Sequence, residues 1–195
     1  MPRPALVLAS TSPYRRDLLG RLKMPFAVDS PGIDESPHPG ETARALVERL
    51  ARQKALAVAQ AHPNALIIGS DQVAVLDGEP LSKPGTHDRA VAQLRGMRGR
   101  RIDFLTGLAV HSTATGITHS RVIPYAVEFR HFSDAEMEAY LAAERPYDCA
   151  GAAKAEGLGI VLIHRMQGDD PNALIGLPLI ALVDLLAMHG VSPIG

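Results

Sequence analysis

The apolar run Ala5–Ala9 is followed within a few residues by a helix start, and this junction restricts the fold more than any other sequence feature. ALVLA has the length and composition of a buried strand. Ser12-Pro13 comes next, and serine at the N-cap with proline at the first helical position is a strong signal for a helix N-terminus. A buried strand that leads directly into a helix is typical of α/β proteins.

The rest of the chain continues this alternation. A long amphipathic helix is predicted over residues 42–60. A buried strand is predicted at 66–69, with a continuation at 73–76 past Asp71, before a hairpin turn at Asp77-Gly78. Further expected elements are helices at 87–97, 133–143 (with a Ser133/Glu136 capping box) and 178–189, paired strands at 102–111 and 117–131 with a turn at Thr115-Gly116, a strand at 160–163, and loops at 32–40 and 147–159. We therefore predict an α/β fold with a mixed central sheet flanked by helices.

Length and composition exclude several classes of protein. The chain has 195 residues, which suits one domain over residues 1–195, or two lobes that share a core. Its net charge of -1 and aromatic content of 4% argue against a nucleic-acid-binding protein. A single cysteine, Cys149, excludes an internal disulfide. No apolar stretch is long enough for a signal peptide or a membrane span, so we expect a soluble cytoplasmic protein without membrane partners.

The turn from Ser10 to Arg16 has the composition of an anion site. It joins the first strand to a helix N-terminus, where free backbone N–H groups and the positive end of the helix dipole favour anions. Arg15 adds a planar guanidinium that suits phosphate oxygens. An ordinary helix cap with surface arginines would leave the same pattern, so this turn does not define a site by itself.

Four further residues complete a set that suits a triphosphate and a metal ion. Asp71 follows a predicted buried strand, where open α/β sheets bind ligands, and its carboxylate could hold a divalent metal or accept a proton from water. Glu35 lies in a predicted loop, Lys54 on the long helix, and Lys83 just past the hairpin. Each of these residues could instead be solvated. Together they supply cations for phosphate oxygens and carboxylates for a metal and a water. The eight histidines show no metal-ligand spacing, and we interpret them as structural.

Several separated motifs, taken together in their order, resemble the Maf-like nucleotide pyrophosphatases over almost the whole chain. The matching stretches are LASTSPYRR (8–16), IDESP (33–37), RLARQKA (49–55), IIGSDQV (67–73), SKP (82–84), FRHFSDAEMEAYL (129–141), CAGAAKAEGLG (149–159) and DPNALIGLPL (170–179). The resemblance implies a Maf/ITPase-like fold with two lobes and an active-site cleft between them. It also implies hydrolysis between the α- and β-phosphates of a nucleoside triphosphate with Mg²⁺ or Mn²⁺, and a homodimer as a possible assembly.

The resemblance also assigns roles to the matching positions. Asp71 looks like the catalytic acid/base, and Glu35 like a carboxylate that handles the metal together with Asp71. The residues that look like phosphate ligands are Ser10, Arg15, Lys54 and Lys83. These roles agree with the chemistry of the residue types, and the resemblance adds that the residues converge.

Three positions are similar to the branch of the family that hydrolyses 7-methyl-GTP. Family members that act on pyrimidine triphosphates tend to carry Arg, Thr and Gln where this chain has Tyr14, Gln72 and Glu156. Methylation at N7 makes guanine cationic, and a tyrosine face gains roughly 0.5–2 kcal/mol from a cation. Glu156 could accept hydrogen bonds from the guanine N1–H and amino group. The stretch 151–154 reads GAAK, where relatives carry a larger or hydroxylated residue. The resemblance therefore does not define the wall of the base pocket at this stretch.

Two other functions remain open at this level. The chain could be a pyrophosphatase for other canonical or modified nucleotides, such as dTTP or UTP. It could also be a nucleotide-binding regulator of cell division with little turnover. A pure binder has no need for two carboxylates, Asp71 and Glu35, beside an anion site, so the sequence favours an enzyme.

Overall fold

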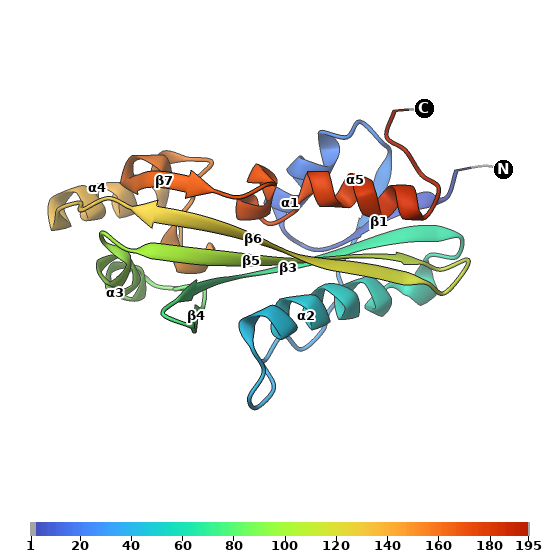
Figure 1. The fold of residues 1–195 in the computed structure, drawn as a ribbon, viewed down its shortest axis with the longest axis horizontal. Helices are drawn as coiled ribbons and strands as arrows, with labels where there is room; N and C mark the ends of the chain where they lie inside the picture. Colours follow the sequence, from blue (N-terminus) through green and yellow to red (C-terminus); the bar gives the residue numbers. More distant parts are fainter. Residues whose placement is uncertain (1–2, 195) are drawn as a thin grey trace.

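The computed structural model describes residues 3–194, and within them seven strands form one mixed sheet. The order is β2-β1-β3-β5-β6-β7, with β4 paired to β3. This confirms the predicted α/β fold with a mixed sheet flanked by helices (Figure 1). The strands are β1 (Ala5–Ala9), β2 (Phe26–Asp29), β3 (Ala65–Leu76), β4 (Glu79–Leu81), β5 (Arg101–Ser112), β6 (Thr118–Phe129) and β7 (Ile163–Gln167).

The five α-helices fall close to their predicted positions. They are α1 (Pro13–Gly20), α2 (Ala43–Ala57), α3 (His87–Met97), α4 (Asp134–Glu144) and α5 (Leu179–Met188), within residues 3–194. Local capping explains three of the starts. Ser12 accepts a hydrogen bond from the Arg15 amide, and Thr42 caps α2 in the same way. Ser133 and Glu136 form the predicted capping box.

Strand β3 changes its pairing partners part way along its length. Its first half pairs in parallel with β1, and the last parallel pair is Ala9 with Gly69. On its other edge, β3 pairs in antiparallel with β5 along almost its whole length, from Leu66 to Val75. Beyond Gly69 the edge that β1 occupied pairs with β4, at residues 74–76. Asp71 therefore lies inside β3, whereas the sequence suggests a carboxylate at the end of a parallel strand. Asp71 lies just beyond the point where β1 leaves the sheet to enter α1.

Helix α2 lies unusually close to the sheet because two glycines allow it. A Cβ atom at Gly69 of β3 would collide with the Ala51 carbonyl, and one at Gly107 of β5 would collide with the Val47 carbonyl. In Figure 1, α2 covers one face of the sheet while α5 lies on the other. The close approach brings Lys54, near the C-terminal end of α2, against β3.

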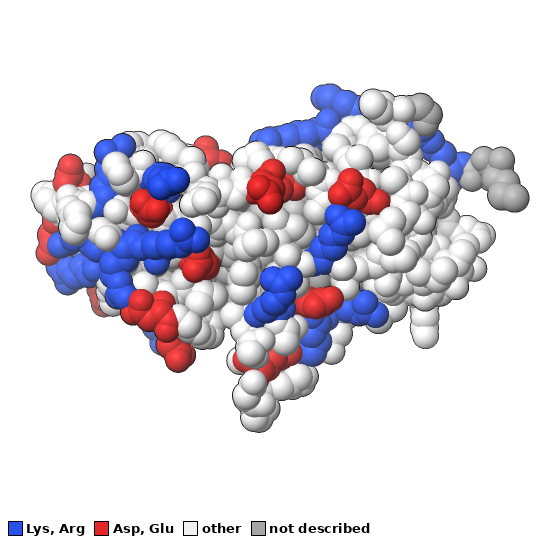
Figure 2. All heavy atoms as spheres, viewed as in Figure 1, with Lys and Arg blue, Asp and Glu red and all other residues white. Residues whose placement is uncertain are grey.

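Two clusters of buried side chains divide the long sheet into two lobes. One cluster packs α1 and α5 on β1 and the start of β3, and we call this part the α1/α5 lobe. The other packs α3 and α4 on the far ends of β5 and β6, and we call it the α3/α4 lobe. On the face shown in Figure 2, basic and acidic side chains are interspersed, in agreement with the net charge of -1.

The prediction of a strand at residues 160–163 is wrong. Residues Leu158–Leu162 form a 3₁₀ helix, and β7 begins only at Ile163. The amides of Gly157 and Gly159 both donate to the Lys154 carbonyl, which closes the chain into turns. Ile160 and Val161 are 45% and 52% exposed, whereas Leu162 and Ile163 are buried, so only the second half of the apolar run lies in the core.

The loop predicted at 147–159 also contains a short 3₁₀ helix, Ala150–Ala152. Two more 3₁₀ helices occur at Ala59–Ala61, after α2, and at Pro171–Ile175, before α5. None of the helices in residues 3–194 has the length and apolar character needed to cross a bilayer.

Candidate active site

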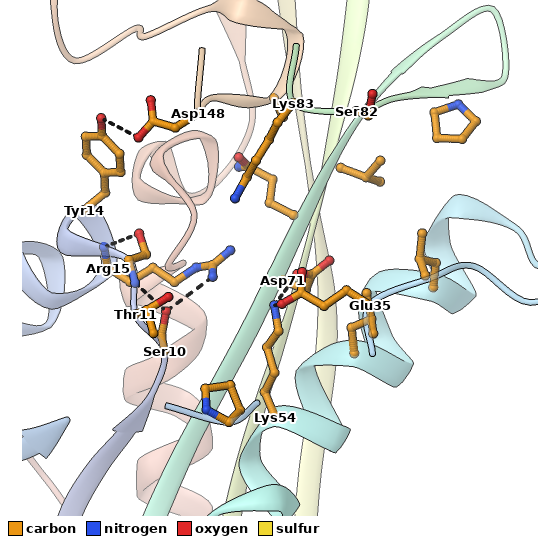
Figure 3. A pocket seen from close by; sticks show the side chains of 18 of the residues that line it. Ser10, Thr11, Tyr14, Arg15, Glu35, Lys54, Asp71, Ser82, Lys83 and Asp148 are labelled. Atoms are coloured by element: carbon orange, nitrogen blue, oxygen red, sulfur yellow. Dashed lines mark hydrogen bonds and ion pairs between the residues drawn. The ribbon is translucent and has the colours of Figure 1, made fainter. Parts of the chain in front are cut away.

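A cavity of about 670 Å³ opens between the two lobes. The α1 turn and the loop before α2 line one side, and the β3–β4 hairpin and the loop after α4 line the other. Figure 3 shows the side chains that point into it. Eight of the nine residues singled out in the sequence line this cavity: Ser10, Tyr14, Arg15, Glu35, Lys54, Asp71, Gln72 and Lys83. The structure therefore brings together residues that lie far apart in the chain.

The turn before α1 forms one end of the cavity. Ser10 is buried, and its hydroxyl accepts a hydrogen bond of 3.1 Å from the Ser12 amide. Arg15 donates from Nε to the Gly176 carbonyl at 2.9 Å, which leaves its terminal nitrogens directed toward Ser10 and the cavity (Figure 3). Burial lowers the pKa of the Arg15 guanidinium, while Asp71 and Glu35 oppose that shift. A desolvated guanidinium at a helix N-terminus suits an anion such as phosphate.

Lys54 joins the two carboxylates at the centre of the cavity. Its ammonium lies 2.7 Å from Asp71 Oδ1 and 2.8 Å from Glu35 Oε1. The Lys54 side chain is 5% exposed and the Asp71 side chain 12% exposed, whereas that of Glu35 is 55% exposed. The prediction made Lys54 a phosphate ligand, but in the structure its ammonium contacts carboxylates.

The two carboxylates fit a divalent cation. Oxygens of Asp71 and Glu35 both lie within 2.8 Å of the Lys54 nitrogen, so the two carboxylates lie close to each other on the same side of the cavity. Carboxylate oxygens are the ligands that Mg²⁺ and Mn²⁺ prefer. Within residues 3–194, no group of three or more His, Cys, Asp or Glu side chains could hold a metal. Any further ligands would have to come from phosphates or water, as is usual for Mg²⁺ at phosphate sites.

Lys83 supplies an unpaired cation on the opposite wall. It follows β4, is exposed, and makes no hydrogen bond or ion pair with other residues of the described chain, 3–194. In Figure 3 its side chain extends into the space between Tyr14 and Asp71. A free ammonium aimed into a cavity that also contains Arg15 is suited to a polyanion.

A second cavity, of about 100 Å³, continues from the first toward the α3/α4 lobe. It shares Tyr14, Gln72 and Lys83 with the larger cavity, and it adds Glu156, the ninth predicted residue. Burial is the main cause that raises the pKa of the Glu156 carboxyl, assisted by Glu144 and Asp148 and opposed by Lys154. Burial therefore outweighs the nearby charges, which are of both signs, in setting the pKa of Glu156.

Two residues that the sequence did not single out flank Tyr14. Its hydroxyl donates to Asp148 Oδ2 at 3.5 Å, and the ammonium of Lys154 lies 5.7 Å from the ring centroid. Lys154 is also paired with Glu144 at 2.7 Å. Asp148 and Lys154 belong to the loop 147–159, which is rich in small and charged residues. That composition is typical of a functional loop, but no local pattern indicated that this loop reaches α1.

The side-chain amide of Gln72 is bonded to other groups of the protein. Its amide nitrogen lies 2.6 Å from the Ala173 carbonyl, 3.0 Å from the Leu174 carbonyl and 3.1 Å from the Thr106 hydroxyl. The amide N–H groups are thus used within the protein. Gln72 lines both cavities, but it is bonded to the backbone before α5.

Together, the fold and the cavity define an α/β protein with cationic and acidic side chains gathered at the junction of two lobes. Comparison with known proteins then gives the family. The model of the Maf-like protein family matches residues 5–189. The chain therefore belongs to the Maf-like family.

Three relatives illustrate the similarity, and each bears the name 7-methyl-GTP pyrophosphatase. The one from Methylobacillus flagellatus is 59% identical over 98% of this chain and 100% of its own. The one from a Polaromonas species is 57% identical, over 96% and 85% of the two chains. The one from Pseudomonas syringae is also 57% identical, over 97% and 98%. Among solved structures, the Staphylococcus aureus Ham1 protein aligns with a TM-score of 0.46 at 18% identity, over 65% of this chain and 72% of that one.

Proposed function

We propose that the protein is a metal-dependent nucleoside triphosphate pyrophosphatase that hydrolyses 7-methyl-GTP to 7-methyl-GMP and pyrophosphate. The observation that carries the proposal is the convergence of Asp71, Lys54 and Glu35 in one cavity with Arg15 and Lys83. Two carboxylates and three cationic side chains around one cavity suit a triphosphate and its metal ion. The printed name of the three relatives supports the choice of substrate.

In this proposal Asp71 is the general base. Its Oδ1 accepts from Lys54, so Oδ2 takes the proton from the attacking water. The water oxygen then bonds to the α-phosphorus, and the bond from that phosphorus to the bridging oxygen breaks to release pyrophosphate. Arg15, at the α1 N-terminus, and Lys83, on the opposite wall, would hold the phosphate oxygens and stabilise the charge that develops on them.

We propose that Glu35 and Asp71 hold Mg²⁺ or Mn²⁺. When bound, the cation would neutralise phosphate charge and polarise the phosphate oxygens. Lys54 would keep both carboxylates oriented, because its ammonium contacts one oxygen of each. Ser10, buried beside Arg15, would contribute its hydroxyl to the phosphate end of the cavity.

The base would enter the smaller cavity beside Tyr14 and Glu156. Lys154 is paired with Glu144. The charged residues that line this cavity are Arg15, Lys83, Asp148 and Glu156. Arg15 and Lys83 would face the phosphates, which leaves two acidic residues, Glu156 and Asp148, for the base. An acidic environment next to an aromatic face favours a cationic base, such as N7-methylguanine, over neutral guanine. The base alone distinguishes one nucleotide from another at this site, because the phosphate contacts are the same for every nucleotide.

Pyrophosphate release across a panel of nucleotides tests the proposal. We expect kcat/KM for 7-methyl-GTP to exceed that for GTP, dTTP and UTP by at least about tenfold, and activity to require Mg²⁺ or Mn²⁺. Equal rates on all four substrates would refute the substrate assignment and favour a broader pyrophosphatase. Tight nucleotide binding without pyrophosphate release would refute the enzyme and favour a regulator.

We also propose a homodimer, as the family resemblance implies, and a cytoplasmic location, as the sequence pattern suggests. Light scattering on the purified protein would decide the assembly, and a mass of a single 20.8 kDa chain would refute the dimer.

A further inference from the structure

The 3₁₀ helix Pro171–Ile175 and the Gly176 that follows it, which we call the turn, border the smaller cavity and pack against both lobes. Ala173 is fully buried in the cluster of the α3/α4 lobe, while Leu177, immediately after the turn, is fully buried in the cluster of the α1/α5 lobe. Leu174 and Ile175 line the smaller cavity beside Glu156. The position of this turn therefore sets one wall of that cavity.

Three carbonyls of the turn accept hydrogen bonds from side chains of the sheet and of α1. The Ser70 hydroxyl lies 2.8 Å from the Gly176 carbonyl and 2.8 Å from the Gly107 carbonyl, and it has one hydrogen to share between them. Arg15 Nε donates to the Gly176 oxygen at 2.9 Å. The Ala173 and Leu174 carbonyls accept from Gln72. The residues on either side of Asp71 in β3 thus hold the two ends of one turn.

Thr106 of β5 is the second anchor at the Ala173 end. Its hydroxyl donates to the Ala173 carbonyl at 2.8 Å and accepts from the Gln72 amide at 3.1 Å. Thr106 is fully buried, and it lines neither cavity of the site. Any effect of Thr106 on a nucleotide must therefore pass through Gln72 and the turn.

From this arrangement we infer that Thr106 is a positioning residue for base selection, which acts by fixing the Ala173 end of the turn and with it the Leu174–Ile175 wall. Ser70 holds the other end, where Gly176 orients Arg15, so its influence falls on the phosphate contacts that all nucleotides share. The two anchors separate base selection from phosphate binding. The inference rests on the proposed function only for the identity of the preferred base.

The test compares two variants of Thr106 that differ in one group each. Thr106→Val removes the hydroxyl at nearly constant volume, and Thr106→Ser keeps the hydroxyl but removes the methyl. We expect Thr106→Val to lower the ratio of kcat/KM for 7-methyl-GTP over GTP by about 3- to 10-fold, through KM, as loss of one or two buried hydrogen bonds predicts. Thr106→Ser should retain most of the wild-type ratio, although its smaller side chain leaves a gap.

Ser70→Ala is the matched control at the other end of the turn. It should reduce kcat/KM for all nucleotides by a similar factor and leave the ratio unchanged. A second measurement, hydrogen exchange, reports on the turn without any substrate. Thr106→Val should accelerate exchange of the Gly176 and Leu177 amides, which donate to Asn172 and Ala173 carbonyls, more than Thr106→Ser does.

The outcomes separate this inference from the proposed function. If wild-type protein does not prefer 7-methyl-GTP, the substrate assignment fails, and the ratio is then measured between the best nucleotide and its closest analogue. The inference itself is overturned if Thr106→Val changes kcat/KM equally for all nucleotides, if Thr106→Ser behaves like Thr106→Val, or if exchange in the turn stays at the wild-type rate. If Thr106→Val does not fold, the same comparison is made between Thr106→Ser and Gln72→Met. An unchanged ratio of kcat/KM in Gln72→Met then overturns the inference.

Discussion

Replacing Lys54 with methionine removes the cation that two carboxylates share, and its effect on stability can be worked out from the contacts. The Asp71 side chain is only 12% exposed, and its 2.7 Å contact with Lys54 would be lost. Breaking a buried ion pair by removal of one partner costs about 3–5 kcal/mol, because the remaining charge is buried without compensation. The pair with Glu35, whose side chain is 55% exposed, adds less than about 1 kcal/mol.

Thermal unfolding with a chelator present, and without nucleotide, measures this effect. For a chain of this length, each kcal/mol shifts Tm by about 2–4 °C, so Lys54→Met should lower Tm by roughly 6–20 °C. Arg121→Met is the matched control. Arg121 and Asp184 lie 2.8 Å apart, but their side chains are 49% and 55% exposed, so this pair should contribute less than about 1 kcal/mol.

A double variant isolates the interaction from the packing of the lysine stem. Asp71→Asn removes the buried negative charge, so adding it to Lys54→Met should restore part of the lost stability. We expect a coupling free energy of at least about 2 kcal/mol from the double-mutant cycle, which is within the range for contacting charged residues. Additive effects of the two substitutions, or a Lys54→Met variant no less stable than Arg121→Met, would refute the reasoning.

Three other predictions concern catalysis and specificity. Asp71→Asn should lower kcat for pyrophosphate release by about two to four powers of ten if Asp71 is the general base, and an active variant would contradict that role. Tyr14→Arg should raise KM for 7-methyl-GTP more than KM for GTP, because it replaces an aromatic face with a cation; equal changes would show that Tyr14 does not face the base. Since burial raises the pKa of Glu156, its carboxylate becomes neutral as the pH falls through that raised pKa. KM for 7-methyl-GTP relative to GTP should then increase toward acid pH, and Glu156→Gln should show a high relative KM with no such dependence. Because the folded-state pKa is raised, ionisation of Glu156 costs stability, and this cost disappears as the pH falls through the same range.

Local sequence signals determined most of the secondary structure and the types of residue in the site. Caps at Ser12, Thr42 and Ser133 lie within a few residues of the groups they bond, so the helix starts could be read from the chain. The error at residues 160–163 has a physical reason as well. An apolar run indicates a strand only when it is buried, and the sequence does not show that Ile160 and Val161 lie at the surface.

Only the tertiary structure decided how those residues are connected. Sequence chemistry and the family resemblance supplied the charges of Asp71, Lys54 and Glu35, but not that one ammonium holds both carboxylates. That contact depends on α2 lying close to the sheet, which the glycines at 69 and 107 permit. In the same way, Gln72 and Thr106 lie 34 residues apart in the sequence, and the pairing of β3 with β5 places both against the Ala173 carbonyl. A sequence shows short-range hydrogen bonds directly, whereas contacts between distant residues exist only once strand register and helix packing have brought them together.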